Sequence, residues 1–128
     1  MNPDDRRYTR EHEWVMVGKD GRALVGITQY AQEQLGDVVF LDLPKKGTRL
    51  EQSQKLGEVE SVKAVSDIYT PLKGVVFEVN QDLVEHPELV NEDPYGKGWM
   101  VRLSSVDRSQ VESLLTSEQY EQFLSQLQ

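Results

Sequence analysis

The sequence predicts a mainly β fold of antiparallel strands with helices at its periphery. Several short runs alternate apolar and polar residues with period two, and turns rich in Gly and Pro separate them. Near the C-terminus the spacing becomes helical, with an apolar stripe at Tyr120, Phe123, Leu124 and Leu127. A chain of 128 residues has the length of one compact domain, so we expect residues 1–128 to form a single domain.

Each predicted element begins or ends at a residue suited to that role. Thr28 can cap a short helix, and Gly36 can end it in a backbone conformation that other residues avoid. Ser109 with Glu112, and Thr116 with Gln119, have the spacing of capping boxes. In order, the expected elements are a hairpin with strands over 8–17 and 23–27, a helix over 29–35, strands over 38–43, 56–62, 64–69 and 75–79, a surface loop over 83–94, a strand over 99–103, and C-terminal helices over about 109–127.

Composition excludes several classes of function. The net charge of -8 disfavours nucleic acid, since an acidic surface repels phosphate backbones. The absence of cysteine excludes disulfides and thiolate chemistry, and no run is long and apolar enough to span a membrane. His12 and His86 lack metal-ligand spacing, so no metal site is expected. No catalytic triad or phosphate-binding loop is present, so we do not expect an enzyme.

Lys63 is the residue that the pattern singles out. It lies between two alternating stretches, at the expected tip of a hairpin within a segment of about residues 55–80, with Val62 before it and Ala64 after it. A lysine at such a tip exposes its amine to a modifying enzyme, and its four-carbon stem can extend a long prosthetic arm. A turn lysine taken alone is more often a solvated surface residue, so the surrounding residues decide the interpretation.

Those surrounding residues resemble the lipoylation segment of the glycine cleavage system H-protein family. The matching string runs from Gly57 to Gly74. The resemblance extends from about Tyr8 to the C-terminal helix, and the other matching signatures are His12-Glu13-Trp14, Gly26-Ile27-Thr28, residues 35–40, Leu43-Pro44, Gly47, Glu78-Val79-Asn80, residues 87–91, residues 93–96 and Gly98-Trp99. The chain departs from the family pattern at Gln29, Ser53, Lys73 and Val75, and none of these residues is adjacent to Lys63 in the sequence.

The resemblance implies a fold, a cofactor and a function. The fold would be a small antiparallel β-sandwich or flattened barrel of the lipoyl-domain kind, with lipoate bound covalently to Lys63. The chain would carry an aminomethyl group from a pyridoxal-phosphate glycine decarboxylase (P-protein) to a tetrahydrofolate-dependent aminomethyltransferase (T-protein). A dihydrolipoyl dehydrogenase (L-protein) would reoxidise the arm, and the chain itself would catalyse nothing. We expect a cytoplasmic monomer, or a mitochondrial-matrix protein if a leader has been removed.

Two further sets of residues follow from the resemblance and from local charge. Recognition by lipoate-attaching enzymes is expected to involve Glu60 and Asp67, on either side of Lys63, and Gly47 and Gly74 at bounding turns. A pocket for the loaded arm is expected to use Glu13 and Asp67, because a carboxylate at the end of an apolar groove can pair with an ammonium group and limit water.

Three other carrier roles are compatible with a lysine at a hairpin tip. A biotinyl carrier typically has Met on both sides of its lysine, whereas Val62 and Ala64 stand here. A lipoyl domain of a 2-oxoacid dehydrogenase is normally fused to a larger chain. A lipoate relay to such complexes is chemically compatible with glycine cleavage, and the sequence does not separate the two roles.

Overall fold

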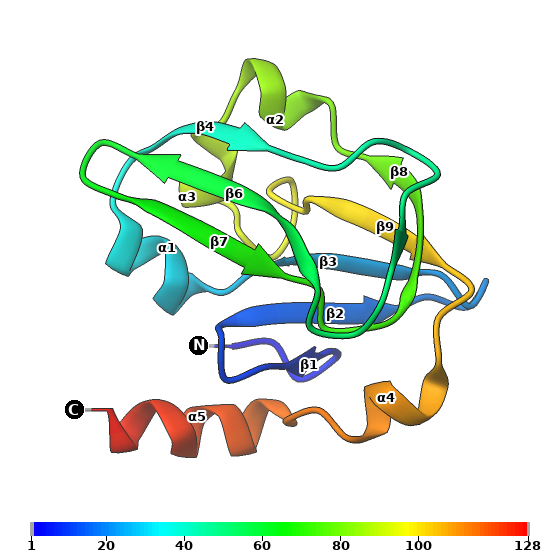
Figure 1. The fold of residues 1–128 in the computed structure, drawn as a ribbon. Helices are drawn as coiled ribbons and strands as arrows, with labels where there is room; N and C mark the ends of the chain where they lie inside the picture. The colour runs from blue at the N-terminus through cyan, green and yellow to red at the C-terminus, as the bar shows by residue number, and fades with distance from the viewer. Residues whose placement is uncertain (1, 128) are drawn as a thin grey trace.

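The structure is a computed structural model that describes residues 2–127, and it consists of two antiparallel sheets with short helices around them (Figure 1). One sheet has six strands in the order β1-β2-β3-β9-β8-β5, and the other has three in the order β4-β6-β7. The strands are β1 (Arg7–Tyr8), β2 (Glu13–Val17), β3 (Ala23–Ile27), β4 (Val38–Asp42), β5 (Arg49–Leu50), β6 (Lys55–Ser61), β7 (Val65–Tyr69), β8 (Gly74–Val79) and β9 (Val101–Ser104). The helices are α1 (Gln29–Leu35), α2 (Asp82–Glu85), α3 (Leu89–Glu92), α4 (Arg108–Glu112) and α5 (Ser117–Gln126).

The main core lies between the two sheets. Alternate side chains of β3 and β9, such as Val25 and Leu103, are fully buried, and they share one apolar cluster with Val59 of β6 and Ile68 of β7. This inward-outward alternation is the period-two pattern of the sequence, and it confirms the prediction of a mainly β fold. A second buried cluster of Tyr8, Trp14 and Tyr120 joins α5 to the outer side of β1 and β2; α4 and α5 run along this edge of the molecule in Figure 1.

Several predicted helix signals are confirmed. The Thr28 side chain accepts a hydrogen bond from the Ala31 amide and caps α1, and Gly36 ends that helix with a φ of 79°. The capping box of Thr116 and Gln119 is present at the start of α5. The capping box predicted for Ser109 and Glu112 is wrong, because Asp107 caps α4 by accepting a hydrogen bond from the Ser109 amide.

The predicted surface loop over 83–94 is wrong, because this segment contains the two one-turn helices α2 and α3. Leu83 and Val90 are fully buried and anchor these turns to the core. Helices of four residues are too short to show an apolar period, so composition alone suggested a loop. Strand β5 was also not predicted, and β9 starts later than expected, with Trp99 outside it. No helix within residues 2–127 is long and apolar enough to cross a membrane.

Candidate functional site

Lys63 lies exposed in the turn that joins β6 to β7, at the left of Figure 1. Tight hairpin turns usually place Gly or Asn at a positive φ, but neither Val62 nor Lys63 has one. Ser61 closes the turn instead. Its backbone N–H donates to the Ala64 carbonyl at 2.8 Å, while its hydroxyl oxygen accepts from the N–H groups of Lys63 (3.3 Å) and Ala64 (3.1 Å). Ser61 is buried, and the sequence interpretation did not identify it.

The stem of Lys63 lies against the end of α1. A Cβ atom built on Gly36 would approach the Lys63 Cε to 3.3 Å, so the glycine leaves room for the lysine stem. The Val62 N–H donates to the Asp37 carbonyl at 3.0 Å, which ties the turn to the segment after the helix. Lys63 is therefore an exposed residue whose stem rests against the end of α1.

A cleft of about 390 Å³ lies beside the turn, between β7 and α1. Its apolar lining includes Ile27, Ala31, Leu35 and Ile68, which come from β3, α1 and β7. Polar side chains also line it, among them Glu11, His12 and Asp67. These residues fit a flexible apolar chain that starts from Lys63 Nζ, because such a chain can lie in the cleft with its far end among polar groups.

His12 forms part of the wall of this cleft. Its Nδ1 is hydrogen bonded to the Tyr120 hydroxyl at 2.8 Å, and burial lowers the pKa of its ring. The φ angle of His12 is positive, at 69°, which is an uncommon backbone conformation for a residue other than glycine. No group of three or more metal-ligating side chains occurs within residues 2–127.

The outward face of the three-stranded sheet carries acidic and apolar side chains in rows. In register across β4, β6 and β7, one row is Phe40–Glu60–Val65 and the next is Asp42–Glu58–Asp67. Lys55 is the basic group paired with the second row, 3.1 Å from Glu58 and 3.4 Å from Asp67, and these partners raise its pKa. Glu60 and Asp67 are both exposed on this face, where a docking enzyme can reach them.

Glu13 lies apart from Asp67, in a neighbouring cleft of about 510 Å³. Only 2% of Glu13 is exposed; its carboxylate accepts from the Thr9 hydroxyl at 2.7 Å and from the Tyr69 N–H at 3.2 Å. Burial raises the pKa of Glu13 to about 7, because water no longer stabilises the charged form. Glu11 lines both clefts, so the two lie side by side, but Glu13 and Asp67 do not line one pocket.

This raised pKa gives the protein a pH dependence that Glu13→Gln should remove. The folded state keeps the Glu13 proton between about pH 4.5 and about pH 7, so its contribution to stability is fully present below that window and is lost as pH rises through it. The free energy of unfolding of the variant relative to the parent should therefore rise by roughly 2–3 kcal/mol between about pH 5 and about pH 8. Urea unfolding at both pH values measures the difference, and a constant difference would contradict the expectation.

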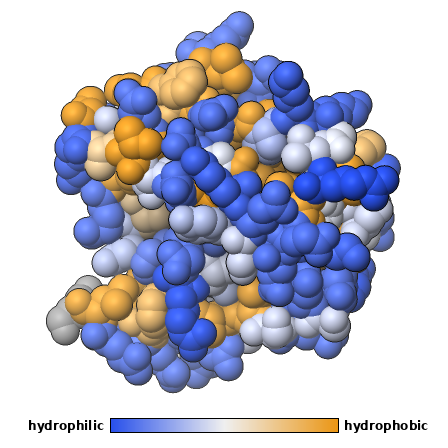
Figure 2. Space-filling view, in the orientation of Figure 1, coloured by the Kyte–Doolittle hydropathy of each residue, from blue (hydrophilic) through white to orange (hydrophobic). Residues whose placement is uncertain are grey.

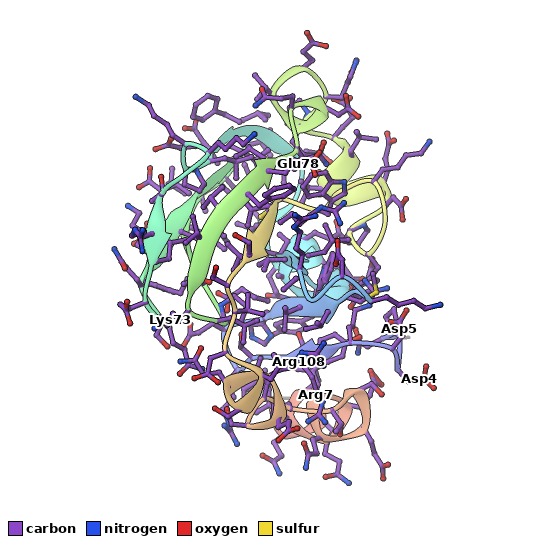
Figure 3. All side chains as sticks on the ribbon, turned by 90° about the vertical axis from the view of Figure 1, so that its right-hand side faces the viewer. Asp4, Asp5, Arg7, Lys73, Glu78 and Arg108 are labelled. Atoms are coloured by element: carbon purple, nitrogen blue, oxygen red, sulfur yellow. The ribbon has the colours of Figure 1, made fainter. Side chains whose placement is uncertain are left out.

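Gly47 lies beside the six-stranded sheet and Gly74 within it, and neither is at the Lys63 turn. Gly47 has a φ of 92° and donates its N–H to the Val76 carbonyl, so its turn requires glycine. Gly74 is not in a turn conformation with positive φ. It begins β8, and a Cβ there would lie 3.0 Å from the Ser104 carbonyl oxygen, so close packing against β9 explains the glycine. Figure 3 views the molecule from the end opposite the hairpin turn, and the labelled Lys73 precedes Gly74 in the β7–β8 connection.

Comparisons with known proteins agree with one another. A sequence model of the family described as glycine cleavage H-protein matches residues 6–127. A glycine cleavage system H protein of Bacillus velezensis is 51% identical over 120 residues, which are 94% of each chain. One from Halothermothrix orenii is 46% identical over 126 residues, 98% of each chain. The crystal structure of a glycine cleavage system H protein from Mycobacterium marinum matches with a TM-score of 0.85 at 40% identity, covering 94% of this chain and 97% of that chain.

A small antiparallel β-sandwich that presents a lysine on a hairpin turn, beside an apolar cleft, has the architecture of a carrier for a covalently bound arm. The chain belongs to the glycine cleavage H-protein family. Members of this family are the lipoyl carriers of the glycine cleavage system, and this function and its lipoate cofactor apply to the chain.

Proposed function

We propose that lipoate is attached in amide linkage to Lys63 Nζ, and that the chain acts as a carrier without catalytic activity of its own. The observation that carries this proposal is the exposed Lys63 amine on a closed turn beside an apolar cleft. When bound, lipoate supplies a reactive disulfide, which is the chemistry that the polypeptide lacks. The residues of the chain position the arm: Ser61 holds the turn, and Gly36 supports the lysine stem.

The attachment site is tested by peptide mapping. The protein is isolated from a host that attaches lipoate, digested with a protease that does not cleave at lysine, and analysed by mass spectrometry. We expect the lipoyl mass on the peptide that contains Lys63 and on no peptide that contains only Lys55 or Lys73. Lipoate found on one of those two lysines would overturn the assignment.

The cleft beside Lys63 is also the proposed resting place of the loaded arm. Asp67 lines this cleft directly, and an ammonium group at the end of the arm would gain a charge-assisted hydrogen bond from a carboxylate there. Glu13 belongs to the adjoining cleft, where a cation would favour its charged form. Glu13 of β2 and Asp67 of β7 therefore remain the proposed pocket acids, as members of two adjoining clefts and not as a pair.

The same proposal covers partners and setting. Lipoate-attaching enzymes have to reach Lys63 Nζ itself. The glycine decarboxylase, the aminomethyltransferase and the dihydrolipoyl dehydrogenase act on the sulfur end of the arm, so their docking sites lie within reach of that arm. Glu60 and Asp67 are the proposed contacts for lipoate attachment, whereas Gly47 acts through the backbone conformation of its turn and Gly74 through close packing against β9. A single domain is supported by a core shared between both sheets, and a cytoplasmic setting by the bacterial relatives. The proposed state in solution is a monomer.

The outward face of the three-stranded sheet, which we propose as the docking face, combines acidic groups with apolar surface. The two kinds of surface should contribute differently to binding. Figure 2 shows apolar surface along the top and upper left, where β4, α2 and the β6–β7 turn lie. The exposed large apolar side chains there are Val39, Phe40, Val62, Val65 and Val84. Acidic groups act at a distance and are screened by salt, whereas apolar contacts form only in the complex and are much less affected by it.

Phe40→Ser should therefore raise the Kd for the decarboxylase by about ten-fold at every salt concentration. Added salt should slow association of the parent and of the variant equally, because both keep the acids. Leu127→Ser is the matched control, since Leu127 is exposed to a similar degree (47%, against 57% for Phe40) but lies after α5. Stopped-flow association and equilibrium titration measure both effects, and equal affinity of the Phe40 variant and the parent would contradict the expectation.

A further inference from the structure

Asn91 lies on α3, outside the hairpin, yet its side chain holds the segment against which the Lys63 turn rests. We propose that Asn91 is a positioning residue for Lys63, fixing the turn in the pose that a lipoate-attaching enzyme recognises. The inference rests on the proposed attachment of lipoate to Lys63, and it assigns a role to a segment whose composition suggested a surface loop.

The Asn91 side-chain amide makes three hydrogen bonds, two to the backbone on either side of Asp37 and one to the Gln32 side chain. Its Oδ1 accepts from the Val38 N–H at 2.9 Å. Its Nδ2 donates to the Gly36 carbonyl at 2.8 Å and to the Gln32 Oε1 at 2.9 Å. Asn91 therefore fixes the backbone on both sides of Asp37 and joins it to α1.

The segment fixed by Asn91 meets the Lys63 turn at three points. The Asp37 carbonyl accepts the Val62 N–H at 3.0 Å. Val38 is the register partner of Ser61, whose side chain closes the turn. The Gly36 backbone lies under the Lys63 stem, with 3.3 Å between Lys63 Cε and the place where a Cβ would stand. Asn91 makes none of these contacts itself, so it acts through residues 36–38.

The chain offers a matched control in Asn80, whose side chain has the same bonding pattern elsewhere. The Asn80 Nδ2 donates to the carbonyls of Trp99 at 2.7 Å and Lys97 at 2.9 Å, and its Oδ1 accepts from the Asp82 N–H at 3.2 Å. Lys97 and Trp99 lie in the α3–β9 connection and Asp82 begins α2, and no hydrogen bond within residues 2–127 joins any of them to the Lys63 turn. Replacing Asn80 removes equivalent hydrogen bonds without disturbing residues 36–38.

The experiment compares Asn91→Asp with Asn80→Asp in the full, unlipoylated chain. Aspartate keeps the shape and the acceptor but loses both donated hydrogen bonds. With a lipoate ligase, ATP and free lipoate, Asn91→Asp should raise KM about ten-fold while kcat changes less, because the lysine is presented in a misplaced turn. Hydrogen exchange of the Val62 amide should also be faster, relative to the Val59 amide, in Asn91→Asp only. Asn80→Asp should lose at least as much thermal stability as Asn91→Asp, because Asn80 is the more buried of the two.

Each outcome decides the inference. Equal KM values and equal Val62 exchange in the two folded variants would overturn it and leave Asn91 a merely structural residue. If Asn91→Asp fails to fold, Asn91→Ser against Asn80→Ser provides the same comparison, since serine also removes both amide donors. Lys63→Arg run in parallel separates the two proposals: continued lipoylation of that variant would refute the attachment site, whereas blocked lipoylation together with a normal Asn91 variant would refute only the positioning role.

Discussion

Lys63→Arg will abolish lipoylation and, with it, glycine-dependent release of carbon dioxide in the reconstituted glycine cleavage system. Arginine keeps the positive charge and most of the stem, but its guanidinium is not acylated by a lipoate-attaching enzyme. Because Lys63 is exposed and forms no ion pair within residues 2–127, the fold should be unaffected. Intact-mass measurement should show no lipoyl addition, and carbon dioxide release should fall to the level without the carrier.

Lys55→Arg is the control for this result. Lys55 begins β6 on the same sheet and is paired with Glu58 and Asp67, so it shares the acidic surroundings of Lys63 but not the turn. Arginine preserves both ion pairs, and exposed pairs of this kind contribute little to stability. The Lys55 variant should be lipoylated and active, and a loss of activity in both variants would point to the acidic face and not to one acceptor amine.

The sequence predicted the parts of the site that lie close together along the chain. Alternation on both sides of Lys63 fixed the hairpin and its tip, and Thr28 and Gly36 marked the limits of α1 beneath it. Contacts between distant segments left no such local signal. Asn91 reaches Gly36 and Val38 across more than fifty positions of sequence, and nothing in its neighbours indicates that contact.

The buried polar groups show the same limit. Glu13 and Asp67 were expected in one pocket, because Asp67 is the acid nearest Lys63 on the following strand and Glu13 stands beside the apolar Trp14. A sequence pattern does not show which cleft each acid lines. The Tyr69 N–H meets Glu13 of β2, whereas the Asp67 carboxylate pairs with Lys55 of β6. Ser61 looked like an ordinary polar position of an alternating strand. Its hydroxyl nevertheless closes the Lys63 turn by accepting two backbone hydrogen bonds, in a turn without the glycine that tight hairpins commonly use.

Gly57 is the glycine on which the hairpin depends most, for a reason of packing and not of backbone freedom. It lies within β6 at an irregularity of the pairing with β7. A Cβ at this position would stand 2.1 Å from the Asp42 carbonyl oxygen of β4 and 3.2 Å from its carbonyl carbon. Backbone atoms held in a sheet cannot turn aside as a side chain can, so any larger residue must push β4 and β6 apart.

Gly57→Ala should therefore cost about 3 kcal/mol of unfolding free energy and lower the melting temperature by about 10 °C. Gly18→Ala is the control, because the atom nearest to a Cβ at Gly18 belongs to the exposed Asp20 side chain, at 3.1 Å, and the nearest backbone atom is the Arg22 carbonyl oxygen, at an ordinary contact distance of 3.7 Å. Thermal unfolding of the two variants measures the difference. Because β6 carries Ser61 and β4 follows the segment beneath Lys63, lipoylation of folded Gly57→Ala should also slow, whereas Gly18→Ala should match the parent. Equal melting temperatures would mean that β4 moves aside freely, and the tight approach of the two strands would then not hold the hairpin in place.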